Sequence, residues 1–190
     1  MPQRHNRAPG HMRQCGLPFK PAMPSDPASS PQSQSSPQYQ VRLGTSADAS
    51  ALDAWLQAAA PLPVPVARAR RLVLEGLLAQ SGHGACLLAD AEGGGFAACL
   101  PVALHPSLAF GGLTACATEW WLDVAAVGTE SGCLEACLAT LADWCRAHGI
   151  RHILLAPALA ANTPSGPSGF VRHASGLWHR GLSPAPKALG

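Results

Sequence analysis

Three stretches of the chain repeat apolar residues at the spacing of an amphipathic helix. Thr45-Ser46-Ala47-Asp48 supplies a hydroxyl cap and an acid for a first turn, and the helix that follows ends before Pro61. A second helix is predicted over about 66–80, where a polar set surrounds four leucines (Arg68, Arg70, Arg71 and Glu75 around Leu72, Leu74, Leu77 and Leu78). A third is predicted from Ser131 to His148, with Gly149 as its stop and an apolar stripe of Leu134, Cys137, Leu138, Leu141 and Cys145.

Strands are predicted where apolar residues alternate or run together, at 39–43, 85–89, 95–103, 114–124 and 150–156, with a last strand or hairpin over 170–182. A loop is expected through His105-Pro106 and Gly111-Gly112. In the long strand 114–124, alternation sets Cys116, Thr118, Trp120 and Leu122 on one face, opposite Ala117, Glu119, Trp121 and Asp123. The order of elements predicts an α/β fold with a central mixed β-sheet covered by helices on both faces.

Composition divides the chain into three parts. Residues 1–38 are rich in Pro, Ser and Gln, so we expect a disordered tail. An alternative is that the start codon is assigned too early and that translation begins at Met12 or Met23. Residues 39–182 form the expected domain, and residues 183–190 a flexible C-terminus. The chain is 47% hydrophobic and 13% charged, which suits a domain with a substantial core.

Charge and cysteine usage exclude several classes of function. A formal net charge of +2 gives no concentrated basic surface, so no nucleic-acid partner is expected. The seven cysteines form no CxxC pair and lie in apolar segments, which indicates reduced thiols in a cytoplasmic protein. No membrane span and no membrane partner are expected. The histidines follow no ligand pattern, so no metal site is expected either.

Several stretches resemble the GNAT superfamily of acetyl-CoA-dependent N-acetyltransferases. Residues 41–48 (VRLGTSAD) are similar to the family's opening "IRxATxxD", and residues 119–124 (EWWLDV) to its "E/D-L-F-V-D-P" strand. The helix from Leu134 to Gly149 and the closing Gly169-Phe170 with Trp178 and Leu182 resemble it too. The resemblance covers about 140 residues and implies a GNAT-like sheet, with acetyl-CoA as co-substrate and no metal.

The resemblance also implies where CoA would bind. In the family a splayed strand end holds the pantetheine arm, and backbone amides of a glycine-rich loop wrap the pyrophosphate at a helix N-terminus. The residues that match these positions are Leu122, Asp123, Val124, Gly128, Thr129, Ser131, Gly132, Cys133 and Asn162.

Two departures from the family pattern bear on this assignment. Val127 replaces the usual Arg or Gln, and Glu130 replaces the central glycine of the loop. A carboxylate within about 4 Å of the pyrophosphate would repel it by roughly 1 to 4 kcal/mol. Downstream, Thr163-Pro164-Ser165-Gly166-Pro167-Ser168 replaces a family helix, and the family's tyrosine, often assigned as general acid, is absent. Residues 129–131 are therefore either an ordinary acidic helix start without a ligand or a CoA loop with Glu130 turned to solvent.

Glu119 is the candidate general base, because the family places an acid near this point of the strand. In an apolar cleft, desolvation would make its carboxylate a stronger proton acceptor; the alternative is a glutamate in solvent or paired with Arg42. Two functions stay open. One is direct acetyl transfer from acetyl-CoA to an amine of a small molecule or peptide. The other is an inactive GNAT-like binding or interaction module that has lost CoA binding. A homodimer is compatible with both.

Overall fold

The structure is a computed structural model that describes residues 40–123, 130–161 and 165–182. Its strands form one eight-stranded sheet in the order β1-β2-β3-β4-β6-β8-β7, with β5 paired to β3 beside that path. The strands are β1 (Gln40–Leu43), β2 (Gly84–Asp90), β3 (Phe96–Ser107), β4 (Gly112–Ala117), β5 (Trp121–Leu122), β6 (His152–Leu155), β7 (Val171–Arg172) and β8 (Trp178–Gly181). The helices are α1 (Ala49–Ala59), α2 (Val64–Leu78) and α3 (Glu130–Ala147), with short 3-10 turns η1 (Ser46–Asp48) and η3 (Pro157–Ala160).

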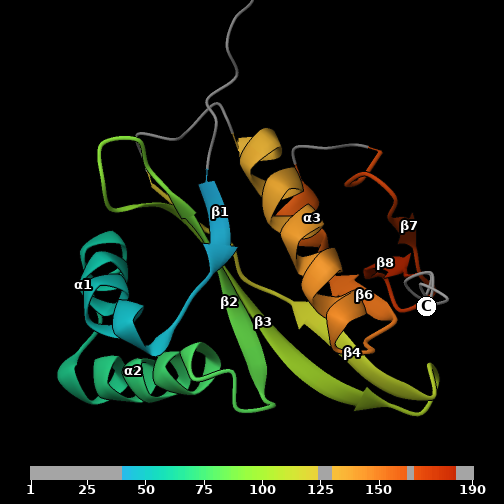
Figure 1. Ribbon diagram of the computed structural model, residues 1–190, viewed down its shortest axis with the longest axis horizontal. Helices are drawn as coiled ribbons and strands as arrows, with labels where there is room; N and C mark the ends of the chain where they lie inside the picture. Colours follow the sequence, from blue (N-terminus) through green and yellow to red (C-terminus); the bar gives the residue numbers. More distant parts are fainter. Residues whose placement is uncertain (1–39, 124–129, 162–164, 183–190) are drawn as a thin grey trace, which may run out of the picture. The chain divides into compact units, whose positions relative to one another are not determined.

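Helices cover both faces of the sheet: α1 and α2 pack on one face and α3 on the other (Figure 1). Two core clusters follow from this arrangement. The sheet separates the two clusters, and successive residues of β2 join one or the other. Leu87 packs on the α3 side and Leu88 on the α1–α2 side. All strand pairs are antiparallel except β4 with β6, which are parallel. The predicted mixed sheet with helices on both faces is confirmed.

Helix α3 follows the predicted amphipathic pattern. Its stripe is fully buried, with Cys137, Leu138, Leu141 and Cys145 all inaccessible to solvent. The helix ends at Ala147, and Gly149 just beyond it has a φ of +72°, the left-handed conformation that glycine adopts most easily. Two hydrogen bonds close this end, from Ile150 N to Cys145 O at 2.8 Å and from Gly149 N to Arg146 O at 3.3 Å.

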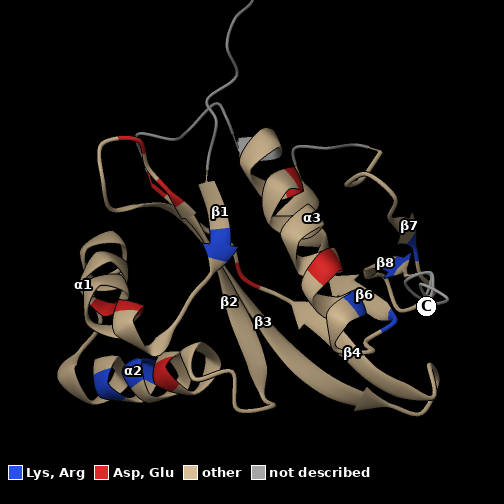
Figure 2. Cartoon of the chain, in the orientation of Figure 1, with Lys and Arg blue, Asp and Glu red and all other residues tan. Residues whose placement is uncertain are grey.

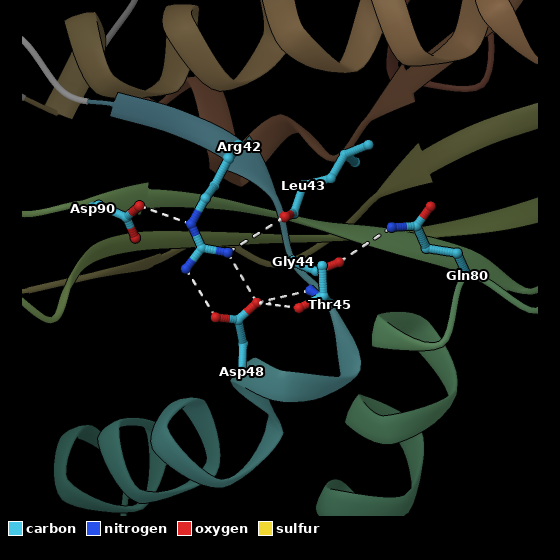
Figure 3. Close-up of polar contacts among 7 residues, drawn as sticks. All are labelled: Arg42, Leu43, Gly44, Thr45, Asp48, Gln80 and Asp90. Carbon is cyan, nitrogen blue, oxygen red and sulfur yellow. Dashed lines mark hydrogen bonds and ion pairs between the residues drawn. The ribbon is translucent and has the colours of Figure 1, made fainter.

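The turn before α1 is fixed by a network around Arg42 on β1 (Figure 3). The guanidinium donates two hydrogen bonds to Asp48, at 2.8 and 2.9 Å, and one to Asp90 at 2.8 Å. Asp48 also accepts the backbone N–H of Thr45 at 2.8 Å, as the predicted helix-start signal requires. This network joins β1, the end of β2 and the start of α1. Elsewhere charged residues are sparse over the sheet, α1 carries acidic colour only, and α2 carries both signs (Figure 2).

The predicted loop at His105-Pro106 is wrong, because β3 continues to Ser107. His105 pairs with Thr114 and Pro106 with Leu113, so β3 and β4 form a long hairpin whose turn is residues 108–111. Pro106 is tolerated because it lies near the end of this hairpin, where few ladder bonds remain.

The predicted single strand over 114–124 is broken between β4 and β5. Ala103 pairs with Cys116, and Cys99 pairs with Trp121. Five residues of β3 (99 to 103) therefore oppose six residues of the other strand (116 to 121), which is a one-residue β-bulge. The extra residue reverses the predicted faces beyond the bulge. Trp121 joins the α1–α2 side, whereas Trp120 and Leu122 pack on the α3 side.

Helix α2 also departs from the pattern read from the sequence. Leu74 and Leu78 are buried as expected, but Leu72 is 65% exposed. The supposed polar set is divided, because Arg71 is on the outer surface with Asp53 and Glu75, whereas Arg70 faces inward. The helical spacing of the leucines therefore predicted a wider buried face than this helix has.

Candidate functional site

The sheet opens where β4 and β6 stop pairing. Their parallel register ends at Ala117 and Leu155, and the last bond of the seam runs from Ala156 N to Ala117 O at 2.9 Å. Beyond that point β5 pairs with β3 alone among the described strands. The edge of β5 that continues the β4 edge towards β6 is therefore left without a strand partner in residues 40–123, 130–161 and 165–182.

The backbone N–H and C=O of one residue of β5 point into this opening. Asp123 donates its backbone N–H to Ala97 O at 2.8 Å, towards β3. In a strand, the N–H and C=O of one residue point towards the same neighbour, and those of the next residue point to the opposite side. The N–H and C=O of Leu122 therefore point away from β3, towards the side on which β6 flanks β4. A backbone donor and acceptor without a strand partner are what an amide-containing ligand needs for pairing.

A cavity of about 210 Å³ lies between the helices α1 and α2 and the strands β3 to β5. Its walls are mainly apolar. They comprise Leu56, Arg70, Val73, Leu74, Leu77, Cys99, Pro101, Val102, Ala103, Cys116, Thr118, Glu119 and Trp121. Because the volume is below the usual range of about 300–1,000 Å³ for drug-sized ligands, the cavity suits a small molecule or a single side chain.

Glu119 lines this cavity from the bulge between β4 and β5. Its side chain is exposed, and its Oε2 accepts a hydrogen bond from Trp121 Nε1 at 3.2 Å. The alternative pairing with Arg42 does not occur, because Arg42 binds Asp48 and Asp90. The carboxylate therefore keeps lone pairs for another donor at the mouth of the cavity.

The two cysteines in the cavity wall are neutral thiols. Burial raises the pKa of Cys116, and a hydrogen bond with Cys86 together with burial raises the pKa of Cys99. Neither has the electropositive surroundings that produce a thiolate. Among the cavity residues, Arg70 and Glu119 are thus the two that carry a full charge.

The predicted CoA-binding residues fall at the two edges of a gap in the described chain. Leu122 and Asp123 are half-buried on and just after β5. Ser131, Gly132 and Cys133 belong to the first turn of α3, where Gly132 is exposed and the Cys133 thiol is fully buried in the core. Val124, Gly128, Thr129 and Asn162 lie outside the described residues. The 3-10 turn Pro157–Ala160 follows β6.

Sequence reasoning missed Arg70 and the two cysteines of the cavity. Cys116 was assigned to the strand face opposite Trp121, and the bulge places both on the same cavity wall. Arg70 was counted among the polar surface of its helix.

No three His, Cys, Asp or Glu side chains of the described chain gather in a way that could hold a metal ion. No helix in the described ranges is long and apolar enough to cross a membrane.

Solved acetyltransferases share this architecture. A GNAT-family N-acetyltransferase from Escherichia coli, solved in complex with CoA, has a TM-score of 0.55 and 16% identity, covering 84% of this chain and 85% of its own. This is the GNAT fold. A GNAT-family acetyltransferase from Listeria monocytogenes gives 0.51 and 15%, covering 76% of this chain and 95% of its own. A protein from Clostridium acetobutylicum, described as a predicted acetyltransferase and solved with acetyl-CoA, gives 0.51 and 13%, covering 67% and 89%.

Sequence comparison alone finds no such relation. No model of a protein family matches the chain, and no curated protein matches it in sequence. The likeness to the GNAT fold thus lies in the topology, which is a set of antiparallel strands followed by a parallel pairing of β4 with β6.

Proposed function

We propose that this chain is an N-acetyltransferase that moves the acetyl group of acetyl-CoA directly to an amine of a small molecule or peptide. The observation that carries the proposal is the position of the Leu122 backbone, which has no strand partner among the described residues and directly follows Trp121, a residue of the cavity wall. The amide groups of a pantetheine arm can pair with this edge as a short strand would. The E. coli neighbour of the same fold was solved with CoA, which supports this use of the opening.

The reaction proceeds in a ternary complex. The acceptor enters the cavity as an ammonium, and Glu119 or a water bound to it removes one proton. The free amine attacks the thioester carbonyl carbon, and the Leu122 N–H stabilises the negative charge that develops on the carbonyl oxygen. The C–S bond breaks as the C–N bond forms. The amine loses its second proton and the thiolate gains one, so the products are an N-acetyl amide and CoA.

The role of Glu119 is tested with Glu119→Gln. We expect kcat to fall about 100-fold or more, in the range of general-base contributions, while acetyl-CoA binds as before. The matched control is Glu92→Gln, which removes the same charge from an exposed turn outside the cavity. Release of the CoA thiol measures turnover and calorimetry measures binding. Equal turnover of the two variants would contradict the assignment.

A second function is an inactive GNAT-like module that no longer binds CoA. The observation in its favour is the sequence of the loop before α3, where Val127 and Glu130 replace family residues. Thermal unfolding with and without millimolar acetyl-CoA distinguishes the two functions. A ligand at 100 times its Kd stabilises the native state by about 2.7 kcal/mol, so binding gives a shift of several degrees. If only the double variant Val127→Arg, Glu130→Gly shows the shift, the inactive module is correct.

A further inference from the structure

We infer that the acceptor is a small amine that also carries a carboxylate, held with its carboxylate against Arg70 and its amine towards Glu119. This inference rests on the proposed acetyl transfer and specifies its substrate class.

The guanidinium of Arg70 has no acidic partner among the described residues. Its Nη1 donates to the backbone carbonyl of Ala60 at 3.1 Å, and its Nη2 donates to the side chain of Gln57. Both acceptors are neutral. Its Nε is shielded from solvent and has no hydrogen-bond partner in the described part of the chain. An arginine has five N–H donors, so three remain unused when these two are subtracted. Unmet donors on a partly desolvated cation are costly, and a carboxylate is the acceptor that suits them best.

The same contacts hold Arg70 in position before a ligand arrives. Ala60 closes the C-terminal end of α1, where carbonyl oxygens lack helical partners and favour a nearby cation. Gln57 is itself anchored by donating to Leu62 O at 3.1 Å. The guanidinium is thus fixed between α1 and α2, so that little side-chain freedom is lost when it binds an anion.

Charge and size together define the ligand. Arg70 lies on the helix side of the cavity and Glu119 on the strand side, and the other lining groups are neutral. A ligand with one negative and one positive group matches this pair, whereas a simple amine leaves Arg70 without an anion. The volume of about 210 Å³ restricts the ligand to a small molecule of the size of an amino acid. The apolar walls favour an aliphatic body between the two charged ends.

The test compares acids with their carboxamides. The probes are L-leucine, L-methionine and γ-aminobutyrate, each against its carboxamide, and NMR titration gives their affinities for three proteins. These are the wild type, Arg70→Gln and the control Arg68→Gln, which loses the same charge from an exposed position of α2 outside the cavity. We expect at least one acid to bind about tenfold or more tighter than its carboxamide to the wild type and to Arg68→Gln, and Arg70→Gln to abolish the difference.

Two results would overturn the inference: no acid preference in the wild type, or the same preference in Arg70→Gln. If Arg70→Gln does not fold, the Nε–H signal of Arg70 in the wild type decides. That signal must shift with the preferred acid and stay in place with its carboxamide, and an unmoved signal rejects the contact. Release of the CoA thiol is measured in the same samples. Turnover without acid preference removes only the inference, whereas acid preference without turnover removes only the proposed transfer.

Discussion

Removing the Asp48 carboxylate should loosen the helices that form one wall of the cavity. Asp48 joins Arg42 on β1 to the first turn of α1, and the substitution Asp48→Asn removes the charge while keeping the size (Figure 3). The hydrogen bonds from Arg42 lower the pKa of Asp48 from 3.8 to about 2, burial opposes this, and the Thr45 backbone N–H contributes further.

The magnitude follows from the pKa difference between the folded and unfolded states. A shift of nearly two units corresponds to at most about 2.4 kcal/mol at 1.36 kcal/mol per unit. Because the Arg42 side chain is 36% exposed, solvent screening reduces this. We therefore expect Asp48→Asn to lower the free energy of unfolding by about 1 to 2 kcal/mol at neutral pH.

The sign of the pH dependence is fixed by the lowered pKa. Between about pH 4 and pH 2 the unfolded state binds more protons than the folded state, so the contribution of Asp48 is present at neutral pH and is lost as the pH falls through this range. Urea unfolding at pH 7 and near pH 3 measures it. The control Asp143→Asn breaks an ion pair whose carboxylate is 79% exposed, and should change stability by less than about 0.5 kcal/mol. A cost for Asp48→Asn that is equal at both pH values would refute the linkage.

Two further predictions concern the core and a histidine of β8. Leu141→Ala on α3 should lower the free energy of unfolding by about 2 to 5 kcal/mol because the side chain is fully buried, and Leu72→Ala, 65% exposed on α2, should cost far less; urea unfolding of both variants compares them. The pKa of His179 should lie below its ordinary 6.5, because burial and the positive charges of His152 and His173 disfavour its protonated form. The folded state then binds fewer protons than the unfolded state, so stability falls as the pH drops below about 6.5; NMR titration of the ring signals checks the pKa, and a value at or above 6.5 contradicts it.

Most of the fold could be predicted from the sequence, because the local capping signals and the pattern of buried residues indicate the same helices and strands. The stripe of α3, its glycine end and the capping residues before α1 each follow from interactions within one or two turns. The last segment also formed one of the two expected structures, a hairpin of β7 and β8. The hairpin of β3 and β4 was shortened in the prediction, because His105-Pro106 is a turn signal locally and only pairing with Thr114 and Leu113 makes it a strand.

The cavity could not be predicted in the same way, since one inserted residue decides it. The bulge leaves no recognisable pattern in the sequence, and the segment 116–121 alternates as an ordinary strand does. With the bulge, Trp121 turns to the side of Cys116 and its indole N–H reaches Glu119. Arg70 was hidden for a related reason. An arginine on a helix is usually solvated, and only the position of the end of α1 shows that this one is enclosed.

The altered loop and the cavity affect different parts of the proposed reaction. A repulsion between Glu130 and the pyrophosphate is the same before and during acetyl transfer, because the pyrophosphate does not change charge. Such a penalty weakens binding of the ground state and the transition state equally, so it raises KM and leaves kcat unchanged. The Leu122 N–H and Glu119 act where charge changes during the reaction, so their loss lowers kcat. An enzyme with this loop is therefore expected to be slow only at low acetyl-CoA, and saturating acetyl-CoA should restore a turnover that an inactive module would never reach.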